Sequence, residues 1–415
     1  MPMLSLLALL AVIPPEPPKE LYDFLSRPDA SFSSKEVEGN IEMTSLTWQG
    51  IPWKHTIVMR HPTKPIVGDT AILYITGDGP FKGDVSTLAA ATLLSGLPVA
   101  MLFNIPNQPL WDLREDDLIA HTFERYLQSG DASWPLLFPM TKAAIRAMDA
   151  IQKAHPNIKK FVVTGASKRG WTTWLVGAAK DKRVIGIAPM VYDNLNLAAQ
   201  MRHQMESWGR YSPMIEDYTK RDLQDKIATE RGNRLALIVD PYSYRRNVTV
   251  PTLIVNGAND PYWTTDALNQ YWAGLAQPKW VTTVANGGHE LGNGMQAATT
   301  IGAFARSLVG TGKLPTKLGW RISRSKGQAT AEMVTEGTAL DKIVLWTATS
   351  QDRRFDDKKW VPAAEMDLGG TTTSQPKITF KVPDTGYLAV FPEFRYTGGE
   401  RKFSLNLPTA VLDLK

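Results

Sequence analysis

Short apolar runs, each ending in a polar or glycine-rich turn, recur along the first two thirds of the chain. Runs of four to eight apolar and β-branched residues are typical of strands that are buried on both faces. Two shorter runs, at residues 45–48 and 53–60, come first. The longer runs and their turns occupy residues 69–80, 97–110, 161–171, 184–193, 251–260 and 279–289.

Apolar residues at helical spacing separate these runs, most clearly at residues 116–127 and 135–154. Strands that alternate with helices need crossover connections, which predicts a mostly parallel sheet covered by helices on both faces. Ligands bind to such sheets beyond the carboxyl ends of the strands. We therefore expect the polar turns that end the runs to lie on one rim.

Two regions depart from this alternation of strands and helices. Residues 194–246 carry mixed helical sequence with large apolar side chains, which predicts a helical lid inserted into the α/β domain. From residue 316 the chain has short alternating runs separated by Gly, Pro and Asp, which predicts a small antiparallel β-sandwich. The expected domains are an α/β domain at 19–315 and a C-terminal β domain at 316–415.

The first eighteen residues hold an apolar run at 3–13 and a proline-rich segment at 14–18. Eleven residues are too few to cross a bilayer, so a secretory signal is favoured over a membrane anchor or a ragged tail. No Lys or Arg precedes the run, and no clear cleavage site follows it. We expect a secreted or periplasmic protein with no membrane span.

The amino-acid composition excludes several kinds of site and partner. The chain has no cysteine, which excludes disulfides, thiol nucleophiles and cysteine-based metal sites. Its 46 basic residues are spread along the sequence and give a net charge of only +5. Without a basic block that could follow a phosphate backbone, we expect no nucleic-acid partner.

The stretch "FVVTGASKRGW" at residues 161–171 runs from an apolar strand through a turn at Gly165 into a helix. A dinucleotide-binding loop would need a glycine where Ser167 stands, and a Walker A loop would need Lys and Ser or Thr after Gly170. Neither phosphate-binding pattern is present, so no cofactor is predicted. A small residue two positions before a serine instead favours the nucleophile elbow of a serine hydrolase.

An elbow serine needs a histidine after a later strand and an acid between them in the chain. His289 lies in a glycine-rich loop after the last apolar run, and His203 in the expected lid is its one serious rival. Asp260 ends the preceding run and is the favoured acid over Asp193 and Asp266. The sequence predicts the triad Ser167, His289 and Asp260.

Two backbone N–H groups should form the oxyanion hole. One belongs to Lys168, directly after the serine, and the other to Gly77 or Asp78 in the turn after an early strand. The side chain of Lys168 either faces a substrate carboxylate or oxyanion, or is a solvated lysine at the start of a helix. Arg169 occupies a position where a second small residue is usual, and we include it among the substrate-binding candidates.

Aromatic residues near these turns are candidates for the wall of a substrate pocket. Trp263 and Tyr262 follow Asp260, and Trp208 lies in the expected lid. They either line an apolar acyl or aryl pocket or pack the core.

Several segments together resemble a known family, the PhoPQ-activated pathogenicity-related proteins, a branch of the α/β-hydrolases. The matching segments are residues 107–127, 134–151, 163–175 and 255–263 and the loop at His289. The resemblance implies a secreted or periplasmic α/β-hydrolase whose natural substrates are poorly defined. The G-x-S-x-x-G pattern is also similar to that of glucuronoyl esterases, which carry a basic residue after the serine, as Lys168 does here.

Three functions fit these features. The first is a carboxylesterase acting on small or polymeric esters through an acyl-enzyme. The second is an amino- or dipeptidyl-peptidase, in which Glu206 or Glu216 would bind the substrate amine. The third is a secreted binding or signalling protein on a hydrolase scaffold, which the intact triad argues against.

Overall fold

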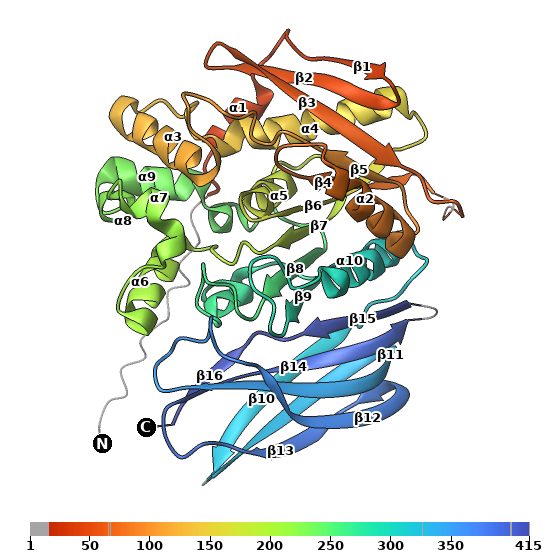
Figure 1. Cartoon of the computed structure of the whole chain (residues 1–415), viewed down its shortest axis with the longest axis vertical. Helices are drawn as coiled ribbons and strands as arrows, with labels where there is room; N and C mark the ends of the chain where they lie inside the picture. The colour runs from red at the N-terminus through yellow and green to blue at the C-terminus, as the bar shows by residue number, and fades with distance from the viewer. Residues whose placement is uncertain (1–15, 65, 67, 326, 399–400, 415) are drawn as a thin grey trace, which may run out of the picture.

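The computed structural model describes residues 16–414 except 65, 67, 326 and 399–400 (Figure 1). The apolar run at 3–13 lies outside the described residues, so the signal peptide stays a prediction. Within the described part of the chain, no helix has both the length and the apolar character needed to cross a bilayer.

The chain is built around a mostly parallel sheet in the order β1-β2-β3-β5-β4-β6-β7-β8-β9. β3 pairs with β5 antiparallel, and the neighbours from β5 to β9 run parallel. This strand order, with a serine on a sharp turn after β6, is the α/β-hydrolase fold. The strands are β1 Ser33–Val37, β2 Asn40–Trp48, β3 Ile51–Arg60, β4 Thr70–Ile75, β5 Val99–Leu102, β6 Lys160–Ala166, β7 Val184–Met190, β8 Thr252–Gly257 and β9 Lys279–Val284.

Both faces of the sheet are buried, as the apolar runs predict. In β6, Phe161 and Val163 belong to the cluster packed under α4 and α5, whereas Val162 belongs to the cluster under α2 and α10. This alternation follows from the two-residue period of a strand. The covering helices are α1 Glu20–Ser26, α2 Lys82–Ser95, α3 Glu115–Ser129, α4 Leu137–Ala154, α5 Lys168–Ala178 and α10 Met295–Leu308.

Residues between β7 and β8 form a group of short helices at one end of the sheet, drawn in green in Figure 1. Buried Asp240 ties the two ends of this insertion together, because its carboxylate accepts hydrogen bonds from the N–H groups of Asn196 and Leu197. The helical insertion is therefore present, and its action as a lid stays a prediction. Its helices are α6 Leu197–Trp208, η1 Pro213–Ile215, α7 Glu216–Thr219, α8 Leu223–Lys226, α9 Glu230–Val239 and η2 Pro241–Tyr244.

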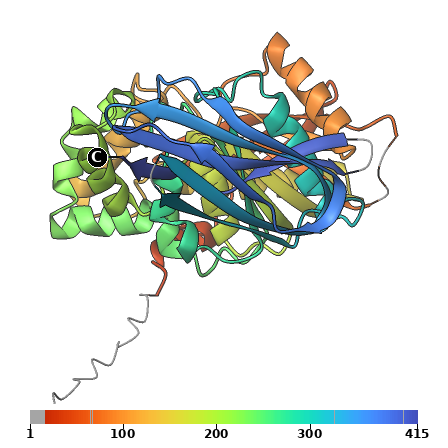
Figure 2. The same ribbon diagram turned by 90° about the horizontal axis from the view of Figure 1, so that it is seen from below.

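After α10 the described chain is all β and its strands pair antiparallel, as expected from residue 316 onward. This region continues the central sheet, because Asn406 of β15 pairs with Val281 of β9. Phe304 of α10 and Leu405 share one core cluster, and Figure 2 shows these strands lying across the α/β part. A separate sandwich domain stays a prediction. The strands are β10 Lys317–Ser325, β11 Gln328–Ser350, β12 Val361–Ser374, β13 Lys377–Lys381, β14 Tyr387–Gly398, β15 Arg401–Asn406 and β16 Ala410–Asp413.

Candidate active site

Ser167 stands on a sharp turn between β6 and α5. Its backbone has φ 57° and ψ −126°, a conformation that costs a non-glycine residue about 1–3 kcal/mol. Two glycines make room for the turn. A Cβ on Gly165 would lie 2.8 Å from the carbonyl oxygen of Arg169, and a Cβ on Gly170 would lie 2.5 Å from that of Met190. The turn thus has the strained geometry by which a nucleophile elbow presents its serine.

His289 and Asp260 form a hydrogen-bonded pair on the same rim. The His289 Nδ1 and Asp260 Oδ2 atoms are 2.8 Å apart, and the carboxylate also accepts a hydrogen bond from the N–H of Tyr262. The Asp260 side chain is only 6% exposed. A carboxylate on Nδ1 selects the tautomer that carries its proton there, which leaves Nε2 as a proton acceptor.

The buried Nε2 atom of His289 has no hydrogen-bond partner among the described residues. His289 lies close to the elbow, because it lines one cavity together with Ala166, the residue before Ser167. Its ring also stacks on Tyr262, at 4.2 Å between centroids, and Tyr262 lines a second cavity with Ser167. His289 Nε2 therefore makes no hydrogen bond to Ser167 in this structure, and the roles of the two residues as nucleophile and base stay predictions.

The rival residues have other partners. Asp193 accepts a hydrogen bond of 2.6 Å from the Tyr271 hydroxyl, and burial is the main cause that raises the pKa of Asp193 to about 7. His203 lies 2.7 Å from Asp266, which also binds Arg353. This second histidine–aspartate pair joins the insertion to the C-terminal region.

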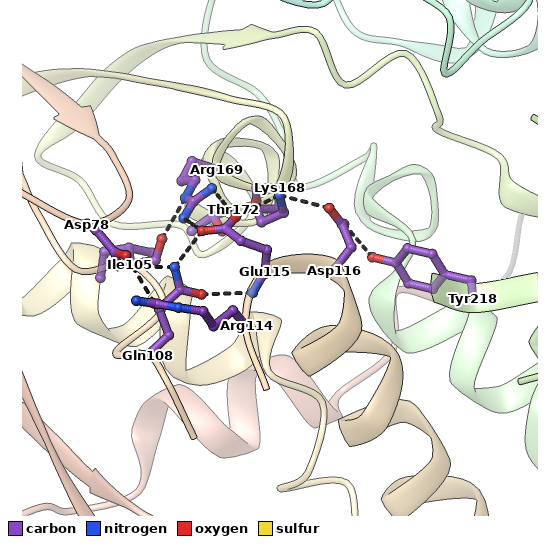
Figure 3. Close-up of polar contacts among 10 residues, drawn as sticks. All are labelled: Asp78, Ile105, Gln108, Arg114, Glu115, Asp116, Lys168, Arg169, Thr172 and Tyr218. Atoms are coloured by element: carbon purple, nitrogen blue, oxygen red, sulfur yellow. Dashed lines mark hydrogen bonds and ion pairs between the residues drawn. The ribbon is translucent and has the colours of Figure 1, made fainter. Parts of the chain in front are cut away.

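Lys168 and Arg169, which follow the serine, lie in a network of ion pairs (Figure 3). Arg169 binds Glu115 through both terminal nitrogens, at 2.7 and 2.8 Å, and donates from Nε to the carbonyl oxygen of Ile105. The Lys168 ammonium is 2.8 Å from the carboxylates of both Glu115 and Asp116. Both cations are nearly buried and already paired with protein carboxylates, and their roles toward substrate stay predictions.

Glu115 is the centre of this network. Burial alone would raise the pKa of Glu115, but the hydrogen bonds and positive charges of Arg169 and Lys168 hold it well below its usual range. The helix expected at residues 116–127 is confirmed as α3, which begins at Glu115. The role of Glu115 in the network depends on Arg169, 54 residues further along the chain, and no local pattern could reveal that pairing.

The expected oxyanion loop lies directly against Arg169. A Cβ on Gly77 would lie 2.6 Å from the Arg169 guanidinium, so a side chain at this position would displace that group from its place between Glu115 and the loop. The carboxylate of Asp78 is bound by Arg114 and by Gln108, each at 3.1 Å. The network therefore connects the elbow to the loop of Gly77 and Asp78, and their role as oxyanion donors stays a prediction.

A cavity of about 100 Å³ adjoins Ser167. Tyr262 and Trp263 are in its wall, together with Trp171 and Tyr192, which stack on each other at 4.8 Å between ring centroids. Trp208 lies outside this wall, at the end of α6, where the Arg354 guanidinium packs over its ring.

A segment of the C-terminal region, residues 351–360, holds the two loops that carry the acid and the histidine. The Asn259 amide, next to Asp260, donates to the carbonyl oxygens of Phe355 and Lys358 at 3.0 and 2.7 Å. Asn286, three residues before His289, exchanges hydrogen bonds of 3.0 and 2.8 Å with the backbone of Trp360. The loops of Asp260 and His289 are thus anchored by a part of the chain that the sequence pattern assigns to another domain.

Known proteins that are similar to this chain include a sequence relative and more distant solved structures. Over 443 aligned positions the chain is 31% identical to autocrine proliferation repressor protein A of Dictyostelium discoideum, and the match covers 95% of this chain and 88% of that protein. Solved structures are more distant. An acetyl xylan esterase from Paenibacillus sp. R4 is 13% identical, with a TM-score of 0.44 over 66% of this chain and 87% of its own. An acylaminoacyl peptidase from Pyrococcus horikoshii is 12% identical, with a TM-score of 0.42 over 70% of this chain and 42% of its own.

A family model matches residues 26–356, which include the elbow serine, the histidine–aspartate pair and most of the segment that anchors their loops. The chain belongs to the family of PhoPQ-activated pathogenicity-related proteins.

Proposed function

We propose that this protein is a serine hydrolase that cleaves carboxylic esters through an acyl-enzyme. The observation that carries the proposal is the strained Ser167 at the edge of an apolar cavity, with the His289–Asp260 pair beside it. A structural serine needs neither a strained backbone nor a buried histidine nitrogen without a partner.

The reaction follows from these positions. Ser167 Oγ attacks the ester carbonyl while His289 Nε2 takes its proton, and Asp260 stabilises the imidazolium that forms. The tetrahedral oxyanion accepts hydrogen bonds from the N–H of Lys168 and from that of Gly77 or Asp78. His289 then protonates the departing alcohol, and water cleaves the acyl-enzyme by the reverse sequence.

Charges around the serine favour an ester over a peptide with a free amine. A peptidase of that kind needs an unpaired acid for the substrate ammonium, but Glu115 and Asp116 are paired with Lys168 and Arg169. The other candidates, Glu206 and Glu216, are exposed and do not line the cavity at Ser167.

Replacing Ser167 tests the proposal. We expect Ser167→Ala to lower kcat on 4-nitrophenyl esters by about 10⁴–10⁶-fold with an unchanged circular dichroism spectrum, because the variant has no nucleophile. Ser129→Ala, at an exposed helix end, is the matched control and should keep full activity. Retention of most ester hydrolysis by Ser167→Ala would overturn the proposal, and faster turnover of peptide anilides than of esters would assign the site to a peptidase.

We also propose that the protein is exported to the periplasm or the medium. The apolar run at 3–13 ahead of a proline-rich segment supports this. Cell fractionation with N-terminal sequencing of the mature protein would test it, and recovery of full-length chain in the cytoplasm alone would contradict it.

A further inference from the structure

The cavity beside Ser167 lies between the sheet and the helical insertion. Its wall on the sheet side comes from Trp171 and Tyr192, and its cover comes from Met201 and Val239 in the insertion. The Trp171 indole N–H donates to the carbonyl oxygen of Val239 at 2.6 Å, which fixes one side chain of the wall to the cover. The cavity is therefore a shaped apolar space next to the nucleophile.

The charged groups of the cavity cancel each other. Among the described residues that line it, Asp116 and Lys168 alone carry charge, and their side chains lie 2.8 Å apart. Gln224 and Trp263 supply buried polar atoms without a protein partner, and both atoms are uncharged. A charged ligand group entering this space would lose its hydration and meet no unpaired counter-charge.

The position of His289 decides which part of a substrate enters. This histidine must protonate the leaving oxygen, so the leaving group has to lie against its Nε2 atom. His289 lines a different cavity and is absent from the wall of this one. The leaving alcohol therefore lies outside this cavity, and the acyl group occupies it.

Volume sets the size of the acyl group. A cavity of about 150 Å³ holds benzene, which corresponds to about 25 Å³ per carbon atom. The cavity of about 100 Å³ then accommodates about four carbon atoms. We propose that the cavity beside Ser167 is an acyl pocket that selects uncharged, short-chain acyl groups of about four carbons. This inference rests on the proposed esterase function and names its substrate class.

A series of 4-nitrophenyl esters tests the proposal on the unmodified protein. Burial of each added methylene should raise kcat/KM about fourfold, hence about 15-fold from acetate to butyrate, and the octanoate should fall below the butyrate because its chain exceeds the cavity. The 4-nitrophenyl hemisuccinate has the same number of acyl carbons as the butyrate but ends in a carboxylate, and we expect it to react at least about 100-fold more slowly. Equal rates for butyrate and hemisuccinate, or rates that keep rising to octanoate, would overturn the proposal.

Variants of α9 test whether the preference for a particular acyl length depends on this cavity. Ala236 lines it, so Ala236→Phe should fill the space and abolish the preference for butyrate over acetate. Leu237, the next residue of the same helix, is 37% exposed and does not line the cavity, so Leu237→Phe should leave the preference unchanged. An unchanged preference in Ala236→Phe would contradict the assignment.

Labelling with an ethyl fluorophosphonate separates the esterase proposal from the acyl-pocket proposal. This small probe reacts with the nucleophilic serine without filling the acyl pocket. A labelled Ser167 with a flat ester series would refute the acyl pocket alone. An unlabelled Ser167 with no ester hydrolysis would refute the esterase itself.

Discussion

At the scale of single residues, one departure from the usual elbow pattern has a structural reason. Arg169 stands where a second small residue is usual, and its guanidinium lies against Gly77 and pairs with Glu115. These contacts of the side chain support the neighbouring loop of Gly77. Glu115 in turn forms ion pairs with two nearly buried cations, so its charge supports both the elbow and that loop.

Glu115→Gln tests this support. The change leaves Lys168 and Arg169 without one of their counter-charges, and we expect a loss of about 1–3 kcal/mol in the free energy of unfolding, reduced from the fully buried case because Glu115 is 39% exposed. We also expect kcat on esters to fall more than tenfold with little change in KM. Urea denaturation at pH 7 and steady-state kinetics measure the two effects.

Asp117 provides the control for this change. It lies on the same helix and pairs with Lys220 and Arg221 away from the elbow, so Asp117→Asn should cost less than about 1 kcal/mol and keep kcat. If Glu115→Gln behaves like Asp117→Asn, the network has no part in positioning the elbow.

At the scale of elements, the proposed acid and base, Asp260 and His289, lie on loops that a distant part of the chain holds in place. The loops after β8 and β9 carry Asp260 and His289, and residues 351–360 hydrogen-bond to both loops. Phe355 and Trp360 fix that segment in turn, because both are buried in one apolar cluster with Phe391. The C-terminal region therefore helps to hold the candidate site through the segment between β11 and β12.

Asn286→Ala tests this anchoring. The variant loses both hydrogen bonds to the Trp360 backbone, which should loosen the loop of His289 and lower kcat by about 10–100-fold, since small misplacements of a catalytic group are costly. Asn247→Ala is the control, because it removes a half-buried side-chain hydrogen bond to the Tyr22 hydroxyl that involves neither of these loops. Equal loss of stability but unequal loss of kcat supports the anchoring role, whereas full activity in Asn286→Ala would contradict it.

Much of the fold could be predicted from the sequence, because it depends on local patterns. The apolar runs became β4 to β9, and Gly165 before Ser167 marked the elbow. The pairings of Arg169 with Glu115 and of Asn286 with Trp360 join residues 54 and 74 positions apart, and periodicity carries no information at that range. The continuity of β9 with the C-terminal strands was missed for the same reason.

At the scale of the whole molecule, buried acids on the rim make stability depend on pH. Burial raises the pKa of Asp193 to about 7, the Tyr271 hydrogen bond opposes this shift, and the charge of Asp260 adds to it. Unfolded, the same carboxyl has a pKa of about 3.9. The folded protein therefore binds one more proton at this position between about pH 4 and pH 7, so the stabilisation from protonated Asp193 is complete below about pH 4 and is lost as the pH rises to about 7.

Asp193→Asn should remove this dependence. Because an amide cannot ionise, the stability of the variant relative to the wild type should increase between pH 4 and pH 7, by at most about 1.4 kcal/mol per pH unit, and stay constant above pH 7. Urea denaturation at several pH values measures the difference. Parallel stability curves for the two proteins would show that Asp193 titrates normally.

The measurement that tests the central claim most directly is the site of modification by a fluorophosphonate probe, mapped by peptide mass spectrometry. We predict a single adduct on Ser167 in the folded protein, no adduct after unfolding in urea, and much slower labelling in His289→Ala, because the histidine activates the serine. Folded protein that carries no adduct on Ser167 would contradict the account.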